Sequence, residues 1–375
     1  MMNLKTLILI ISLILSFTWF SCQQKQSTST ENGYLRIGAT LSNISDSTLL
    51  KLVSLDSDVL VDSAYVVDGK LLMFGKLFSE RPEKLRLSGV DAATNEFLFT
   101  DFIVGNERIS FVADKSDFPW NIDVSGSVYQ DQQEIFHQVL YQKELLLQKM
   151  QDSFDESSDR KVLSIKLKQL NDSMDEVSAN RIRENFNTYA AIKSFKYHKQ
   201  SFSETDLGKL YQTLSEDLKD TKEAQAIKMQ SENPKPETGD QYYDYTAINQ
   251  NGDSVSLSDF NNKYLLLHFS SRYCYFSQSS IPEVKKFYEK CQNQIEVVAI
   301  SQDASKADWL ETVERDSINW TYLWDGKAEF NDATIKYWKT GTPNYVLISP
   351  DKTILEQWFG YSEGAIENRI GKYFN

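Results

Sequence analysis

The sequence predicts an α+β multidomain protein, with a β-sandwich-like domain at residues 33–127, a helical segment at 128–232 and an α/β domain at 234–375. Three observations support this division. Short apolar runs separated by turn residues fill the first region, and apolar residues recur at helical spacing in the second. In the third, buried-type strands alternate with amphipathic helices, which is typical of a mixed sheet covered by helices. A chain of 375 residues is long enough for two or three such domains.

Composition excludes several classes of function. The 40 Lys and Arg against 53 Asp and Glu give a net charge of −13, which argues against nucleic acid as a partner because phosphate binding needs clustered basic residues. The three cysteines and three histidines are scattered, so no metal site is expected. Neither of the common glycine-rich nucleotide-binding loops occurs, and the sequence predicts no cofactor.

The first 32 residues are expected to lie outside the fold. Lys5 precedes an apolar run that ends at Phe20, which is typical of an export signal over residues 1–21. Ser21-Cys22 follows and resembles the lipobox of bacterial lipoproteins, which implies lipid attachment at Cys22 and a membrane-anchored, periplasm-facing envelope protein. Residues 22–32 are polar and predict a flexible tether. An ordinary cleaved signal peptide and a membrane anchor remain the alternatives.

The region 33–127 predicts short strands with regular turns, as in a sandwich or a partly open barrel. Its strongest local signal is Asp68-Gly69 between two apolar runs, which predicts a hairpin. From 128 to 232 the apolar stripes predict two or three long amphipathic helices. Two prolines and a glycine at 233–239 then break the pattern.

In the C-terminal region, residues 264–269 and 295–300 are expected to form buried strands. Hairpins are predicted around Asn251-Gly252 and over 345–355. Helices are predicted after the first buried strand, over 304–315, and over 363–374.

Several motifs of this region occur in one order and spacing. They are Leu257-Ser-Asp-Phe260, the strand 265–269, Tyr273-Cys-Tyr-Phe-Ser277, Pro282, and Gly341-Thr-Pro-Asn-Tyr-Val-Leu-Ile348. With these motifs, residues 234–375 resemble the thioredoxin superfamily. The branch that they resemble contains the cytochrome-maturation proteins and the alkyl hydroperoxide reductase and thiol-specific antioxidant proteins. Residues 61–75 and 124–127 resemble an uncharacterised β domain that is often fused in front of such domains in envelope lipoproteins.

The resemblance implies a Cys-x-x-Cys redox site at the start of a helix, but this chain has Cys274 followed by Ser277. A hydroxyl cannot form a disulfide, so the motif alone cannot run a two-electron dithiol cycle. Cys291 lies 17 positions further along the expected helix. That is about 25 Å at 1.5 Å per residue, whereas a disulfide needs Cα atoms within about 7 Å. Cys291 is therefore expected to pack as a small apolar residue.

Other residues are candidates for supporting Cys274. Arg272 and the helix N-terminus favour a thiolate, and Ser277 can donate a hydrogen bond to it. His268 lies six residues earlier in a strand and is either a proton acceptor beneath the motif or a core histidine. Thr342 and Pro343 correspond to the family's cis-proline loop, which implies a groove for the extended chain of a substrate or partner.

Two functions remain open. In the first, Cys274 is a monothiol catalyst of disulfide exchange or isomerisation that acts on protein or peptide thiols and disulfides. In the second, the domain is redox-inactive and binds peptide or protein through the groove at Pro343. A peroxidase is less favoured, because Leu267 and Ser271 stand where peroxiredoxins place Pro and Thr before the cysteine.

Overall fold

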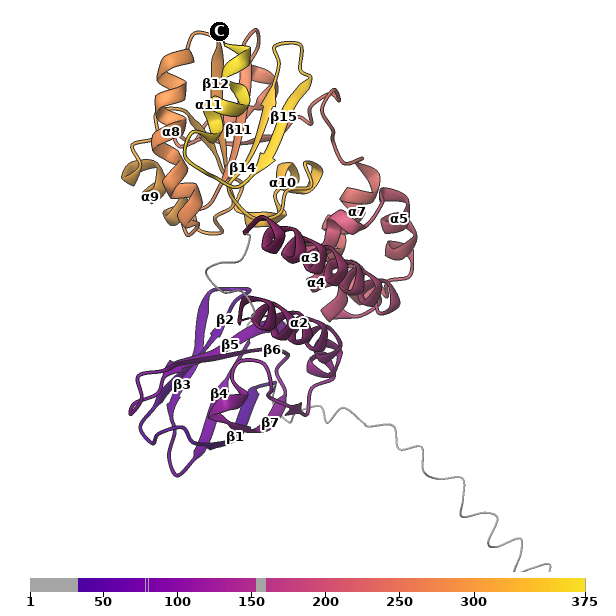
Figure 1. Cartoon of the computed structure of the whole chain (residues 1–375), viewed down its shortest axis with the longest axis vertical. Coiled ribbons are helices and arrows are strands. Elements are labelled where there is room, and N and C mark those ends of the chain that lie inside the picture. Colours follow the sequence, from indigo (N-terminus) through magenta and orange to yellow (C-terminus); the bar gives the residue numbers. More distant parts are fainter. Residues whose placement is uncertain (1–32, 78, 80, 153–159, 375) are drawn as a thin grey trace, which may run out of the picture. The chain divides into compact units, whose positions relative to one another are not determined.

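The computed structural model describes residues 33–77, 79, 81–152 and 160–374. They form two compact units, one up to residue 144 and one from residue 145, and each is described by itself. Figure 1 shows the strands of the first unit, the helices that follow in the chain, and the C-terminal sheet with its helices. The predicted α+β organisation is confirmed. The residues predicted to form the signal peptide, the lipobox with Cys22 and the tether lie outside the described residues.

The N-terminal unit contains two four-stranded sheets, with strand orders β4-β1-β7-β8 and β3-β2-β5-β6. Every second side chain of β1 is buried, as expected for a strand with one face toward a core. Residues of both sheets share one hydrophobic core, which confirms the predicted sandwich. The strands are β1 (Leu35–Ser42), β2 (Leu49–Ser54), β3 (Val59–Tyr65), β4 (Lys70–Gly75), β5 (Glu83–Val90), β6 (Phe97–Val104), β7 (Arg108–Asp114) and β8 (Val124–Ser125).

The turn at Asp68-Gly69 forms, but it does not join two strands of one sheet. Val67 and Lys70 exchange backbone hydrogen bonds of 3.0 and 2.9 Å across it, and both turn residues have positive φ. Beyond this point β3 pairs with β2, whereas β4 pairs with β1 of the other sheet. The hairpin prediction was wrong in this respect. The two apolar runs form strands of different sheets, and the turn connects the two sheets of the sandwich.

The middle region has two long helices and then shorter ones. The helices are α2 (Val128–Asp152), α3 (Arg160–Glu184), α4 (Tyr189–His198), α5 (Glu204–Gln212), α6 (Glu216–Lys219) and α7 (Lys222–Glu232). Side chains of Thr188, Ser203 and Thr221 accept N–H groups at the starts of α4, α5 and α7. These N-caps begin new helices, so the region contains more and shorter helices than apolar periodicity predicts.

The C-terminal domain is built on a five-stranded mixed sheet of order β13-β12-β11-β14-β15. β11, β12 and β13 are parallel, β14 runs antiparallel to β11, and β15 runs antiparallel to β14. A small hairpin of β9 (Thr246–Ile248) and β10 (Ser254–Ser256) turns at Asn251-Gly252 as predicted. The sheet strands are β11 (Tyr264–Ser270), β12 (Ile295–Ser301), β13 (Thr321–Leu323), β14 (Asn344–Ile348) and β15 (Ile354–Phe359), and the helices are α8 (Tyr275–Cys291), α9 (Lys306–Arg315), α10 (Asp332–Lys336) and α11 (Ala365–Ile370).

Alternating side chains of the central strand β11 serve two cores. Leu266 packs with residues of α8, α9 and α11, whereas Leu265 and Leu267 pack with residues of β9 and α10 on the other face. His268 lies two residues after Leu266 in the same strand, so its side chain also points to the α8 side of the sheet. The sheet is covered on both faces, as its near-continuous apolar strands predict.

The proline-containing segment 233–239 is attached to the C-terminal domain. The indole N–H of Trp338 donates to the Asn233 carbonyl at 3.2 Å, and the Gln357 amide donates to the Pro236 carbonyl at 2.8 Å. The Lys199 ammonium, just after α4, donates to the Lys339 carbonyl at 2.6 Å. The shorter helices therefore pack on the domain, and one of their junctions with it lies close to Pro343 in the sequence.

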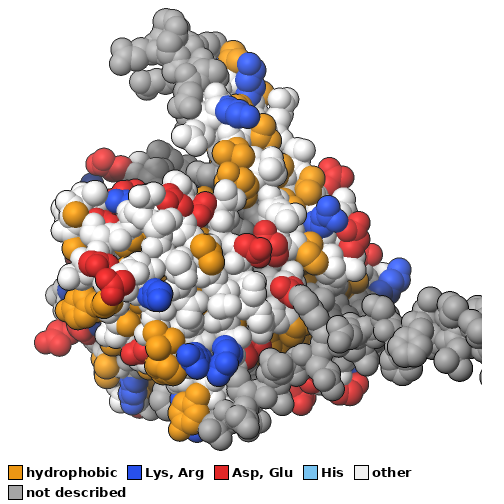
Figure 2. Space-filling model, turned by 90° about the horizontal axis from the view of Figure 1, so that it is seen from below, with side chains coloured by type: hydrophobic (Ala, Val, Ile, Leu, Met, Phe, Trp, Pro, Cys, Tyr) orange, Lys and Arg blue, Asp and Glu red, His pale blue; other side chains and the backbone are white. Residues whose placement is uncertain are grey.

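On the face shown in Figure 2, acidic, basic and apolar side chains are interspersed, and the basic groups do not form a continuous stripe. Within the described part of the chain, no helix combines the length and the apolar character needed to cross a membrane.

Candidate functional site

Cys274 stands at the N-terminus of α8, at the end of the short loop that follows β11. It is the N-cap residue, and its carbonyl accepts the N–H of Gln278 at 3.1 Å, which is the first bond of the helix. The thiol is half-buried, so it is accessible but not fully solvated. A side chain in this position faces the unpaired N–H groups of the first helical turn, which stabilise negative charge.

Two sets of contacts act on the thiol in opposite directions. Its Sγ donates to the Thr342 carbonyl at 3.1 Å, and a carbonyl acceptor favours the protonated thiol. Burial also raises the pKa of Cys274, but the Ser277 and Thr342 side chains and the N–H groups of Ser277 and Phe276, which can donate to the thiolate, outweigh burial. The pKa of Cys274 is therefore lowered from its ordinary value, as a reactive cysteine requires.

Ser277 and Cys291 have separate environments. Ser277 is 1% exposed, and its hydroxyl forms no hydrogen bond in the structure as it stands. It lies near enough to the Cys274 sulfur to lower the pKa of the thiol. Cys291, the last residue of α8, is buried in the core between the helices and the sheet, where burial raises its pKa. Both described cysteines are free thiols.

Thr342, the residue before Pro343, lies against the thiol. The peptide bond between them is cis, and the Thr342 carbonyl accepts the Cys274 thiol. The amide of Asn344 fixes the loop by donating to the Gly341 carbonyl at 2.7 Å. The Pro343 carbonyl accepts the Gly360 N–H at 2.9 Å, which anchors the loop to the end of β15. A loop fixed in this way presents its edge next to Cys274.

The structure does not bring the Arg272 side chain to the thiolate. Its guanidinium binds Asp308 at 2.6 Å and binds the carboxylate of Glu311 through both terminal nitrogens. Two carboxylates compensate its charge, and it is not among the groups that shift the pKa of Cys274. The expected role of Arg272 is corrected accordingly: it ties the loop before Cys274 to α9.

Asp303 holds the loop before Cys274, and sequence reasoning missed it. Its buried carboxylate accepts the Ser271 hydroxyl and the Arg272 N–H, each at 2.9 Å. The Ser301 hydroxyl donates to its other oxygen, also at 2.9 Å. Asp303 lies just beyond the end of β12, which is parallel to β11. The ends of adjacent parallel strands meet at one edge of a sheet, and an acid just after the second strand was the available signal.

His268 is a core residue in this structure. It is 0% exposed, its ring stacks on Tyr345 with centroids 4.9 Å apart, and its Nδ1 has no partner. Its Nε2 lies 3.4 Å from the Ser280 hydroxyl, which itself donates to the Ser277 carbonyl at 2.7 Å. Burial lowers the pKa of His268 to about 3, so the ring stays neutral and is a weak base. Of the two readings, the geometry favours the core histidine.

This environment predicts a pH dependence of stability. The pKa of His268 is about 3 in the folded protein against 6.5 for the free side chain. Its contribution is fully present above pH 6.5 and is lost as the pH falls toward 3, because the unfolded chain binds the proton first. We expect His268→Phe to remove about 2–3 kcal/mol of the stability loss between pH 6.5 and 4.5. Urea unfolding at several pH values measures it, and an unchanged pH slope in the variant would contradict the assignment.

The residues next to Cys274 in the sequence have exposed aromatic side chains. Tyr273, Tyr275 and Phe276 flank Cys274 in the sequence and are 70%, 73% and 55% exposed. The rings of Tyr275 and Phe276 contact each other edge to face at 5.5 Å. Exposed aromatic groups next to a cysteine form an apolar contact surface, which suits a polypeptide rather than a small polar substrate.

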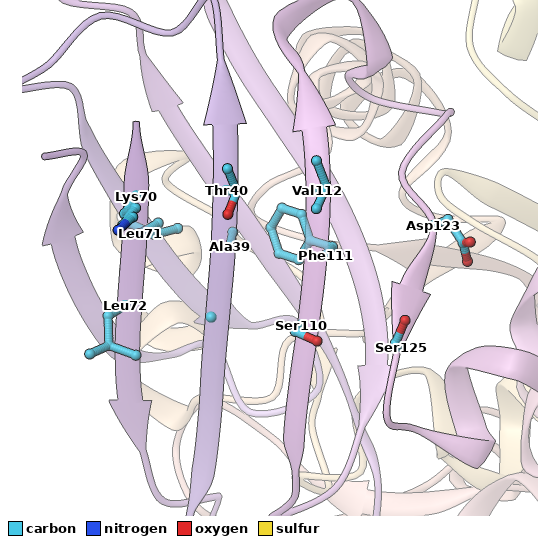
Figure 3. Close-up of a pocket in the computed structure, with 11 residues that line it drawn as sticks. Ala39, Thr40, Lys70, Leu71, Leu72, Ser110, Phe111, Val112, Asp123 and Ser125 are labelled. Carbon is cyan, nitrogen blue, oxygen red and sulfur yellow. The ribbon is translucent and has the colours of Figure 1, made fainter. Parts of the chain in front are cut away.

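A concave surface on the N-terminal unit lacks the chemistry of the Cys274 site. It is the outer face of β4, β1 and β7 with the adjoining β8, where Thr40, Leu72, Val112 and Ser125 are seen in Figure 3. Lys70 and Asp123 are the charged groups that line it. Among the described residues, no group of His, Cys, Asp or Glu could hold a metal ion.

Comparisons with known proteins place the C-terminal region. Residues 238–357 match the model of the AhpC/TSA family. No curated protein sequence matches the chain significantly. Similar solved structures include the thioredoxin domain of a thiol-disulfide oxidoreductase from Bacteroides vulgatus, with 26% identity over 37% of this chain and 99% of that one and a TM-score of 0.35. A thiol:disulfide interchange protein from Bacteroides sp. has 26% identity over 38% of this chain and 92% of that one, with a TM-score of 0.35.

The family match covers the strand before Cys274, the helix that Cys274 caps and the loop of Pro343, which are the segments that build the site. The resemblance seen in the sequence is therefore confirmed for this region: the C-terminal domain of the chain is a thioredoxin-like domain that matches the AhpC/TSA family model.

Proposed function

We propose that the protein catalyses thiol–disulfide exchange through the single thiol of Cys274. The observation that carries the proposal is the position of this sulfur: half-buried, at a helix N-terminus, with a lowered pKa, and 3.1 Å from the carbonyl that precedes a cis-proline. A core cysteine would have the opposite properties, and Cys291 in the same helix has them. The contrast within one helix supports a reactive role for Cys274.

The reaction balances without an internal partner. The Cys274 thiolate attacks one sulfur of a substrate disulfide, an S–S bond to Cys274 forms, and the other substrate sulfur leaves as a thiolate. A different thiolate of the same substrate then attacks the mixed disulfide and releases Cys274. A substrate disulfide has been exchanged for another, and no electrons are gained or lost. Isomerisation of polypeptide disulfides therefore fits a Cys-x-x-Ser site better than net reduction.

The surroundings of the sulfur support a polypeptide substrate. An extended chain lying along the fixed edge of residues 341–343 would pass over Cys274, and the exposed rings of Tyr273, Tyr275 and Phe276 would contact its apolar side chains. Ser277, the Thr342 hydroxyl and the helix N–H groups would stabilise the thiolate before attack and again when it leaves.

The test is a covalent trap in cells. Proteins linked to Cys274 are isolated after acid quenching and thiol blocking, from strains that produce wild type, Cys274→Ser or the matched control Cys291→Ser. We expect mixed disulfides in wild type and Cys291→Ser, and none in Cys274→Ser. Alkylation of purified protein across pH should also give an apparent pKa for Cys274 below about 8.5. Absence of any adduct together with an alkylation pKa at or above that value would refute a redox role.

The second candidate is a redox-inactive module that binds extended peptide. The hydrogen bond from the thiol to the Thr342 carbonyl favours it, because this bond holds the sulfur against the cis-proline loop in its protonated form. It predicts that Cys274→Ala keeps the wild-type phenotype, whereas a substitution in the groove, Thr342→Arg, abolishes it. Equal loss in both strains would count against it.

We also propose that the protein is lipid-anchored in the cell envelope and faces the periplasm. The apolar run up to Phe20, Cys22 at its end and the polar tether support this. Labelling of cells with a radioactive or clickable fatty acid should mark the wild-type protein and leave Cys22→Ala unlabelled. Equal labelling of the two, or none in either, would refute the anchor.

A further inference from the structure

A cavity of about 360 Å³ lies in the C-terminal unit between α4, α7 and the segment that leads to the cis-proline. Its volume is within the range of small-molecule sites. The walls are mainly apolar and include Ile192, Phe195, Phe330, Ile335 and Phe359. Thr340 and Gly341 complete one side. Such a lining would receive the apolar body of a ligand.

Two lysines line this cavity and are more than nine-tenths buried. Lys199 is 6% exposed and Lys339 is 9% exposed. The Lys199 ammonium donates to the Lys339 carbonyl at 2.6 Å, and the Lys339 ammonium donates to the Gln357 amide oxygen at 2.7 Å. Each ammonium has three N–H donors, and each has this one neutral acceptor. Among the described contacts, neither lysine forms an ion pair with a carboxylate.

The carboxylates in the same walls are occupied by other lysines. Glu329 binds Lys196 at 2.7 Å, and Glu223 binds Lys193 at 3.0 Å. Of the lysines that line the cavity, Lys199 and Lys339 thus have no ion pair within the described part of the chain, and Glu329 acts on Lys199 only through space. Burying a cation without an anion is unfavourable by several kcal/mol. A chain gains nothing in stability from two such lysines facing one cavity, which argues for an anionic ligand.

We propose that this cavity binds a small amphiphilic carboxylate, a molecule with one carboxylate and an alkyl or aryl body, whose oxygens accept from Lys199 and Lys339. A carboxylate has two oxygens for the two ammonium groups, and its bonds to them are charge-assisted. The apolar walls described above would enclose the rest of the molecule. The inference does not depend on Cys274 or on thiol chemistry.

The same geometry gives binding a definite dependence on pH. Burial lowers the pKa of Lys339 to about 7 and that of Lys199 to about 8, and a bound carboxylate favours the protonated form of both. Binding should therefore take up protons near pH 8 and weaken as the pH rises further. The other charged groups that act on this pair are Lys196, Lys235 and Glu329, and Glu223 also lines the cavity.

Calorimetric titration of the purified full chain with decanoate tests the proposal. 1-Decanol serves as the uncharged probe with the same apolar body. Decanoate should bind at least about tenfold more tightly than decanol. Each of the variants Lys339→Met and Lys199→Met should weaken the binding of decanoate by about tenfold or more. Lys228→Met, at an exposed position of α7, is the matched control and should bind like wild type.

Wild-type titrations at pH 8 in buffers of different ionisation enthalpy add a readout that needs no variant. Proton uptake on binding is expected. The proposal is overturned if decanoate does not bind, if decanol binds as tightly, if both lysine variants bind like wild type, or if no protons are taken up.

Discussion

Replacing Asp303 by alanine is expected to lower the free energy of unfolding by about 2–4 kcal/mol and to slow the reaction of Cys274. Asp303 is 3% exposed, and its carboxylate accepts from Ser271, Arg272 and Ser301. Removing it leaves the Arg272 N–H and two hydroxyl groups without their acceptor. The loop that carries Cys274 to the helix N-terminus then loses its side-chain attachment to the segment that follows β12.

Chemical denaturation and the rate of Cys274 alkylation at pH 7 measure the two effects. The matched control is Asp308→Ala, which removes a partly exposed ion pair with the Arg272 guanidinium and should cost about 1 kcal/mol or less. Asp303→Asn keeps one carbonyl acceptor, so its loss of free energy of unfolding should lie between the losses of Asp303→Ala and Asp308→Ala. If Asp303→Ala were no more destabilising than Asp308→Ala, the attachment of the loop would have to lie elsewhere.

Ser277→Cys is expected to restore a dithiol site. Ser277 lies three residues after Cys274 in the first turn of α8, and side chains at this spacing are neighbours on a helix. Its buried hydroxyl has no well-formed bond to lose, so a thiol of similar size can take its place. Oxidation should then give a disulfide between Cys274 and the introduced thiol.

Two measurements follow from this change. The oxidised variant should lose two hydrogens by mass, and its reduction of insulin disulfides in the presence of dithiothreitol should exceed that of wild type by about tenfold or more. The double variant Cys274→Ser/Ser277→Cys is the control and should show neither effect. If the single variant formed no disulfide, Ser277 would not lie beside the sulfur as described.

The strands and helices of the C-terminal domain could be predicted because their local patterns agree with their environment. Residues 264–269 are continuously apolar apart from His268 and form a central strand covered on both faces. Asn251-Gly252 gave a true hairpin because the segments on its two sides pair with each other. Asp68-Gly69 has the same local signal, but its neighbours pair in two different sheets, which local sequence does not encode.

In the candidate site, too, some features could be predicted from the sequence and others could not. Cys274, Ser277, Thr342 and Pro343 were predicted and lie together, since motif order and the family's topology fix their places. The contacts of individual charged side chains were not predictable. Arg272 could pair with any carboxylate that the fold brings near, and Asp308 and Glu311 come from a helix more than 30 positions further on. Asp303 reaches the loop only because β12 pairs with β11.

The central claim is that Cys274 works without a second sulfur in its own chain. Its most direct test is peptide mapping by mass spectrometry of the mature wild-type monomer after oxidation and blocking of free thiols. The account predicts that Cys274 is recovered as a blocked thiol or joined to a separate molecule, with Cys291 reduced. Recovery of Cys274 in a disulfide with another cysteine of the same chain would contradict it.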